Sequence, residues 1–144
     1  MGPRSAAELR EAATHFDRAA ALSPAPAMKE LLAEAAAFFR QQLHETDGAK
    51  ARAYLRDRGM DPRTQAAFGL GYAPNSRNRL KEHLAGKGVD KQQIEACGLV
   101  VHGQDIPVSY DRFRDRVTFP IANLSNRTIA FGARAHRLGR RLDL

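Results

Sequence analysis

Hydrophobic residues recur at helical spacing through the first half of the chain. The strongest stretch predicts a helix over about residues 27–45, with an apolar face made by Met28, Leu31, Leu32, Ala35, Phe38, Phe39 and Leu43. Before it, Ser5 and Glu8 form a capping box that predicts a helix ending at the proline-containing linker of residues 23–26. The chain therefore opens with helices.

Shorter helices should follow this long one. One ends at Gly59, one begins at the Asp61 cap, one carries Leu80, and one begins at Asp90. Between the second and third of these helices, residues 69–74 form a tight segment bounded by glycines.

Beyond residue 98 the pattern becomes that of β-strands. Residues 99–101 and 106–109 should pair as a hairpin. A second hairpin is predicted around a polar loop at residues 123–127, because apolar positions alternate at Val117, Phe119, Ile121, Ile129 and Phe131. Pro120 has no N–H to donate, so it predicts either that this strand lies at an edge of the sheet or that no neighbouring strand pairs with the side to which the Pro120 nitrogen points. The fold class is α+β, with N-terminal helices followed by a small antiparallel sheet with short helices.

The second hairpin makes a prediction about arginines. If Phe119 faces Phe131, Arg116 lies opposite Arg134, and both project from the face opposite the apolar one. Two further arginines share the parity of Arg116, namely Arg112 and Arg114. Like charges in direct opposition are unfavourable, so either water screens them or an anion sits between them.

Composition bounds the class of protein. The chain has 144 residues, the length of one domain, and 23 Lys plus Arg against 16 Asp plus Glu give a net charge of +7, which favours polyanionic partners. It has no apolar run long enough to span a bilayer and no signal-peptide pattern, which predicts a cytoplasmic protein.

Metal chemistry is not expected in this chain. Cys97 is the single cysteine, and the five histidines lack metal-ligand spacing. No Asp-x-Asp pair of the kind that holds two magnesium ions is present. Tyr72, Tyr110 and Phe113 could stack on bases, with core packing as the alternative.

Several stretches, in this order and spacing, resemble bacterial replicative DNA primases. They are AYLRDRGM at residues 53–60, FGLGYAP at 68–74 and YDRFRDRVTFPI at 110–121. IAFGAR at residues 129–134 is similar to the next segment of that family. The resemblance covers about residues 29–134.

The resemblance implies a structural role and specific site residues. Residues 27–144 would be the N-terminal subdomain of the RNA-polymerase core, preceded by a helix and linker at 1–26. In the family this subdomain packs beside a Toprim domain and helps to guide single-stranded DNA template and nucleotides. The family motif places an arginine at Arg116, near template or incoming nucleotide, and Arg112 and Arg134 also match family arginines. A guanidinium suits phosphate because its planar fork offers several donors.

The departures from the family limit the expected activity. The zinc-binding module and the Toprim carboxylates do not occur in these residues, so we expect no catalysis by this chain alone, and magnesium only on a Toprim domain. The chain would be either a piece of a primase or a free-standing relative. In the full-length enzyme, a replicative helicase or other replication proteins are further partners. A rival hypothesis is a non-enzymatic interaction protein that binds replication proteins or competes with primase.

Overall fold

The computed structural model describes residues 28–135 and 142–143. The predicted helix at Ser5 and the boundary at residue 26 lie outside the described residues. The helices are α2 (Met28–Leu43), the 3-10 turn η1 (Thr46–Gly48), α3 (Ala49–Asp57), α4 (Pro62–Ala67), α5 (Arg79–Gly86) and α6 (Lys91–Ala96). The strands are β1 (Gly71–Ala73), β2 (Val100–Val101), β3 (Tyr110–Asp111), β4 (Arg116–Ala122), β5 (Thr128–Arg134) and β6 (Leu142–Asp143). The α+β prediction is confirmed.

The helices begin and end where their capping residues predict. The Asp61 carboxylate accepts a hydrogen bond from the Thr64 backbone N–H at 2.8 Å, and this bond lowers the pKa of Asp61. After α3, Gly59 takes φ +80, a left-handed conformation that ends the helix. Asp90 and Gln93 form a complete capping box at the start of α6.

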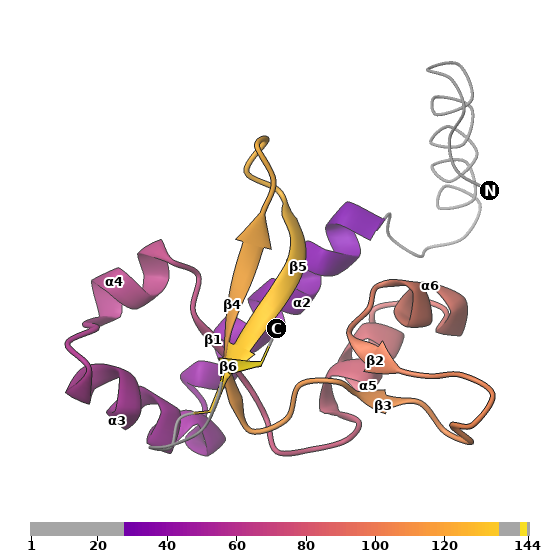
Figure 1. Ribbon diagram of the computed structural model, residues 1–144, viewed down its shortest axis with the longest axis horizontal. Helices are drawn as coiled ribbons and strands as arrows, with labels where there is room; N and C mark the ends of the chain where they lie inside the picture. Colours follow the sequence, from indigo (N-terminus) through magenta and orange to yellow (C-terminus); the bar gives the residue numbers. More distant parts are fainter. Residues whose placement is uncertain (1–27, 136–141, 144) are drawn as a thin grey trace.

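The central sheet has the order β1-β4-β5-β6 and is antiparallel throughout. Figure 1 shows α3 and α4 on one side of this sheet, and α5, α6 and the two-stranded β2–β3 sheet on the other. Strand β1 falls within the glycine-bounded segment of residues 69–74, for which the sequence predicted no strand. Within the described residues, no helix is both long and apolar enough to cross a membrane.

Both faces of the sheet are covered by helices. On one face Phe131 packs edge-on against Phe39 of α2, with ring centroids 5.3 Å apart. On the other face Tyr72 and Val117 pack with Leu55 of α3. The apolar residues therefore fall on both faces, and simple alternation does not define the inner one.

The predicted register of the β4–β5 hairpin is wrong by one residue over most of its length. Phe131 lies opposite Pro120, and Arg134 lies opposite Val117. The ladder shifts by one residue between Ile121 and Ala122. The predicted pairing therefore holds only next to the loop, at Ala122 and Thr128, and fails from Ile121 to Val117. Arg116 and Arg134 are consequently neither opposite each other nor on one face.

Pro120 sits in β4, which has a neighbour on each side. The ladder with β1, however, ends at the Gly71 to Thr118 pair, so Pro120 lies beyond the reach of β1. The expectation of an edge strand is wrong for β4 as a whole, whereas one side of Pro120 does lack a ladder partner.

The first predicted hairpin pairs with a different segment. Residues 106–109 form no strand, and β2 instead pairs with β3, in the register Val100 to Asp111. Asp111 of β3 is buried, and its carboxylate accepts a hydrogen bond from the start of α5, which holds β3 in place beside β2. The connection between the two strands is therefore longer than the predicted turn.

Candidate nucleic-acid interface

Arg116 begins strand β4 at the end of the sheet. Its backbone lies opposite Ala73 of β1, and its half-buried guanidinium donates to the carbonyl oxygens of Asp115 at 3.1 Å and Arg114 at 3.4 Å. These bonds hold the side chain close to its own strand.

The turn before Arg116 is fixed by Asp115. This residue has φ +56, a left-handed conformation that is uncommon for a side chain other than glycine. Its carboxylate accepts a hydrogen bond from the buried Tyr72 hydroxyl at 2.8 Å, and its N–H donates to the Pro74 carbonyl at 3.3 Å. Tyr72 thus has a core role, one of the two interpretations that the sequence left open.

Arg134 lies at the end of β5, beside the start of β4. Its Nε donates to the Tyr54 hydroxyl of α3 at 3.2 Å, and the side chain is exposed. The Arg58 guanidinium lies 5.0 Å from the Tyr54 ring centroid. Arg134 and Arg116 therefore share one end of the sheet but leave it from opposite faces.

Arg112 is directed to a different part of the chain. Its Nη1 donates to the Gly98 carbonyl at 3.2 Å, after α6, and its backbone N–H donates to Leu99. Residues 112–115 are not part of a strand, so the predicted shared parity of Arg112, Arg114 and Arg116 does not hold. Arg116 and Arg134 therefore share one end of the sheet on opposite faces, and Arg112 lies apart from both.

A cluster of two arginines on one tyrosine was not predicted. The Arg77 guanidinium lies 4.3 Å, and that of Arg114 5.2 Å, from the ring centroid of Tyr110. We call these three residues the Tyr110 cluster. Arg77 follows a loop that has no periodic pattern, and 33 residues separate it from Tyr110, so no sequence signal pairs them.

Asp111 connects this region to α5. Its carboxylate accepts the backbone N–H groups of Leu80 at 2.8 Å and Lys81 at 3.0 Å, and its own N–H donates to the Arg77 carbonyl at 2.6 Å. Burial raises the pKa of Asp111 to about 6, although the two N–H groups act in the opposite direction.

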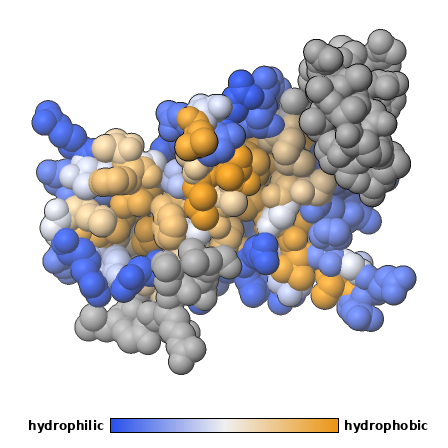
Figure 2. Space-filling view, turned by 45° about the horizontal axis from the view of Figure 1, so that its top comes forward, coloured by the Kyte–Doolittle hydropathy of each residue, from blue (hydrophilic) through white to orange (hydrophobic). Residues whose placement is uncertain are grey.

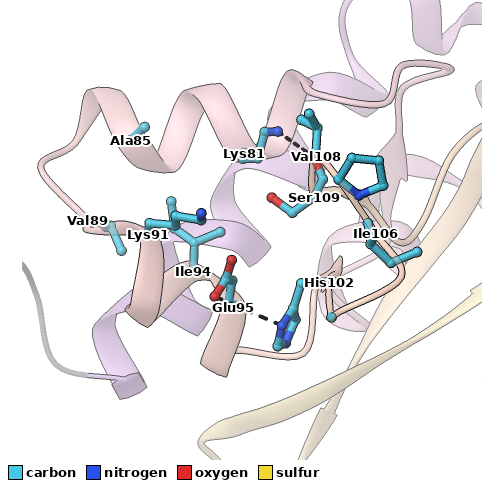
Figure 3. Close-up of a pocket in the computed structure, with 12 residues that line it drawn as sticks. Lys81, Ala85, Val89, Lys91, Ile94, Glu95, His102, Ile106, Val108 and Ser109 are labelled. Atoms are coloured by element: carbon cyan, nitrogen blue, oxygen red, sulfur yellow. Dashed lines mark hydrogen bonds and ion pairs between the residues drawn. The ribbon is translucent and has the colours of Figure 1, made fainter.

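Two hollows lie on either side of the segment that carries Ile106 and Val108. The larger, of about 590 Å³, lies between α5, α6 and this segment, with Lys81 and Lys91 at its wall (Figure 3). The smaller, of about 440 Å³, is lined by Arg77, Asn78, Ile106, Pro107, Val108, Ser109 and Tyr110. The second hollow adjoins the Tyr110 cluster.

Metal-ligating side chains do not gather in the described part of the chain. Within residues 28–135 and 142–143, no three His, Cys, Asp or Glu side chains lie close enough to hold an ion. Cys97 donates its Sγ–H to the Ile94 carbonyl, and burial raises the pKa of its thiol. The site's chemistry is therefore that of guanidinium groups and aromatic rings.

Solved structures share this arrangement of helices and strands. The DnaG primase catalytic domain bound to ssDNA matches with a TM-score of 0.70 and 29% identity, over 81% of this chain and 38% of that one. A DNA primase domain from Pseudomonas aeruginosa matches with a TM-score of 0.69 and 40% identity, over 81% of this chain and 37% of that one. The fold is that of a part of a DNA primase catalytic domain.

Sequence comparison gives the family. Residues 38–141 match the family described as the DNA primase catalytic core, N-terminal domain. The DNA primase of Mycolicibacterium smegmatis is 42% identical over 102 residues, and that of Pseudomonas aeruginosa is 42% identical over 105 residues. These matches cover 71% and 72% of this chain but 16% of each relative. The chain belongs to this family, and the predicted resemblance is confirmed.

Proposed function

We propose that this chain guides single-stranded DNA template and nucleotides during RNA primer synthesis, as part of a DNA primase at work in the cytoplasm. The observation that carries the proposal is the matching fold of a primase catalytic domain that is bound to ssDNA. The net charge of +7 supports it, because phosphate contacts made by Lys and Arg release counterions from the polynucleotide.

Arg116 and Arg134 are the residues we assign to the template or incoming nucleotide. Both stand at one end of the sheet, and each is oriented by a hydrogen bond to a fixed group, the Asp115 carbonyl and the Tyr54 hydroxyl. A guanidinium oriented in this way loses less rotamer freedom when it binds phosphate. Arg112 donates to the Gly98 carbonyl, so it would contact the DNA template at a point further from the sheet end that carries Arg116 and Arg134.

Fluorescence anisotropy of a labelled oligothymidylate tests this proposal. We expect wild type to bind weakly at about 50 mM salt and more weakly at about 200 mM. Arg116→Ala should weaken binding about ten- to a hundredfold, since a hydrogen bond to a charged group contributes about 1.5–3 kcal/mol. The measurement is the dissociation constant at both salt concentrations.

Arg63→Ala is the matched control. It removes the same charge from an exposed position on α4, at the far side of the molecule from β2 and β3 (Figure 1). Equal losses in Arg116→Ala and Arg63→Ala would contradict an arginine-specific role. No binding by wild type at about 50 mM salt would contradict the proposed function.

Catalysis requires more than these residues supply. Phosphoryl transfer in polymerases uses metal ions held by carboxylates, and the described residues offer no such group. We propose that magnesium is held by a Toprim domain of the same enzyme, and that this chain alone makes no primers.

The β4–β5 hairpin is our proposed contact for that Toprim domain. The side chains of Ile121 and Ile129 are 40% and 53% exposed, and Leu124 at the tip is fully exposed. Figure 2 shows hydrophobic surface along this part of the molecule. Phe68, 65% exposed, precedes Gly69, where an added Cβ would lie 3.0 Å from the ring of Pro120 in β4. An exposed apolar patch of this kind is typical of an interface.

The same patch keeps a second function open. A non-enzymatic interaction protein that binds replication proteins, including a replicative helicase, would also need exposed apolar residues. The effect of Arg116→Ala on DNA binding separates the two functions. A template-guiding subdomain needs this arginine to bind DNA, whereas a protein that only binds other proteins does not.

A further inference from the structure

The larger of the two hollows is separate from the arginines assigned to DNA. It measures about 590 Å³ and lies between α5, α6 and the segment that carries Ile106 and Val108 (Figure 3). Within the described residues, its lining contains no arginine, phenylalanine, tyrosine or tryptophan. Bases stack mainly on aromatic rings, and guanidinium groups suit phosphate best, so this hollow does not fit a polynucleotide.

The floor of this hollow is apolar. Ala85 of α5, Ile94 of α6 and Val89 from the turn between these helices line it (Figure 3). Val89 and Ile94 are each 4% exposed and belong to the core, whereas Val108 at the rim is 69% exposed. An apolar side chain that entered the hollow would be buried itself and would also cover Val108. The hollow therefore favours a partner that brings an apolar group.

The walls of the hollow carry more positive than negative charge. Lys81 reaches it from α5, and its ammonium group donates a hydrogen bond to the Ser109 carbonyl. Lys91 begins α6, is exposed, and has no ion-pair partner among the described residues. Glu95 is the one carboxylate among the described lining residues, and its Oε1 lies 4.0 Å from His102 Nδ1. Two ammonium groups against one carboxylate favour an anionic partner.

We propose that this hollow docks a short acidic segment of another protein. One apolar side chain of the segment enters the hollow and lies against Val89, Ile94 and Val108, and carboxylates on either side of it meet Lys81 and Lys91. An apolar anchor in a pocket with a polar, charged rim is a common arrangement at protein interfaces. The proposal goes beyond the proposed function, because none of the residues assigned to DNA lines the hollow.

Fluorescence anisotropy of a labelled peptide on the whole chain tests this proposal. The probe carries one leucine flanked on both sides by aspartates. We expect it to bind at about 50 mM salt and more weakly at about 200 mM, because salt screens exposed charges. A peptide with serine in place of the leucine, and one with lysines in place of the aspartates, should each bind at least about tenfold more weakly.

Ala85→Glu is the variant that closes the site. Ala85 is exposed on α5, one helical turn after Lys81, so a glutamate there pairs with this lysine and places bulk and negative charge at the hollow. Binding of the acidic peptide should fall by about tenfold or more. Ala66→Glu makes the same change at an exposed position of α4, on the other side of the sheet (Figure 1), and should leave binding unchanged. Equal effects of the two substitutions would overturn the proposal.

Two milder variants keep the test informative if Ala85→Glu unfolds. Lys91→Ala should weaken binding of the acidic peptide about two- to fivefold at about 50 mM salt, as for an exposed ion pair, and less at about 200 mM. Val108→Ser should weaken it about threefold at both salt concentrations, because the apolar contact is not screened. Thermal unfolding by circular dichroism shows which variants are folded. Wild-type affinity in both folded variants would contradict docking in this hollow.

Competition separates this site from the DNA path. An unlabelled oligothymidylate should not displace the peptide, and Arg116→Ala should bind the peptide as wild type does. Displacement by the oligothymidylate would place the peptide on the DNA path, and the proposal would be wrong. It would also be wrong if wild type bound no leucine peptide at about 50 mM salt, or bound the serine peptide equally well. None of these results decides the proposed function, which the binding of DNA by wild type and Arg116→Ala tests separately.

Discussion

At the scale of single residues, Asp111 has the most unusual environment. Its side chain is 3% exposed, yet it carries the carboxylate that satisfies the first N–H groups of α5 at Leu80 and Lys81. A buried carboxylate costs desolvation energy, and the hydrogen bonds offset only part of that cost. The raised pKa, about 6, is the result.

Asp111 makes the stability of the fold dependent on pH. Its pKa rises from 3.8 in the unfolded chain to about 6 in the folded one, so between these values the folded state binds more protons. Its contribution is therefore largest below pH 4 and falls as pH rises through 6, by about 3 kcal/mol. Urea unfolding at a series of pH values measures this dependence.

Asp111→Asn is the comparison for that series. The amide does not titrate, so the difference in unfolding free energy between wild type and variant should change between pH 4 and 6 and be flat above 7. Asn keeps one carbonyl oxygen for two N–H donors, so the variant is also less stable throughout. A pH-independent difference would show that the carboxyl titrates normally.

At the scale of elements, the contact of β1 with α2 sets the spacing between sheet and helix. Gly71 of β1 comes so close to α2 that a Cβ there would lie 2.6 Å from the backbone carbon of Phe39. Glycine is required at this position because real Cβ atoms do not approach backbone so closely.

Gly71→Ala should therefore destabilise the fold. We expect a loss of about 1–3 kcal/mol, since either β1 or α2 must move. Gly86→Ala, at the end of α5, is the control, because a Cβ there meets nothing within 4 Å. Chemical denaturation should show an unchanged or slightly higher midpoint for that control. Similar effects of the two substitutions would argue against the tight contact.

The helices could be predicted from sequence, and parts of the sheet could not. Helix α2 and the cap at Asp61 follow from local periodicity and from single capping residues. Strand β1 is three residues long and buried on both sides, so it shows no alternation. The register failed because helices cover both faces and because one irregularity at Ile121 shifts the ladder.

The candidate site was partly predictable for the same reason. Arg116 and Arg134 could be placed at one sheet end because the chain runs directly from one strand to the next. Pairing Arg77 with Tyr110 depends on how Asp111 docks against α5, a tertiary contact without a local signal.

At the scale of the whole molecule, the β4–β5 hairpin carries exposed apolar residues outside the core. Leu124→Ser together with Ile129→Ser should change the unfolding free energy by less than about 0.5 kcal/mol for each exposed substitution. The same pair should weaken association with a primase Toprim domain, measured by calorimetric titration. Unchanged association would place that contact elsewhere on the molecule.

Strand β5 has an outer edge that its neighbours leave mostly uncovered. Among the described residues, β6 pairs only with Ala133 and Arg134, so the stretch from Thr128 to Gly132 has no strand on that side. Its side chains at Ile129 and Ala130 are uncharged and exposed. Charged residues or proline on an edge strand commonly prevent it from pairing with the edge strand of another molecule. Prepared by itself at high concentration, the domain is therefore prone to aggregate through this edge, and Ile129→Lys is the first change to make for a soluble sample.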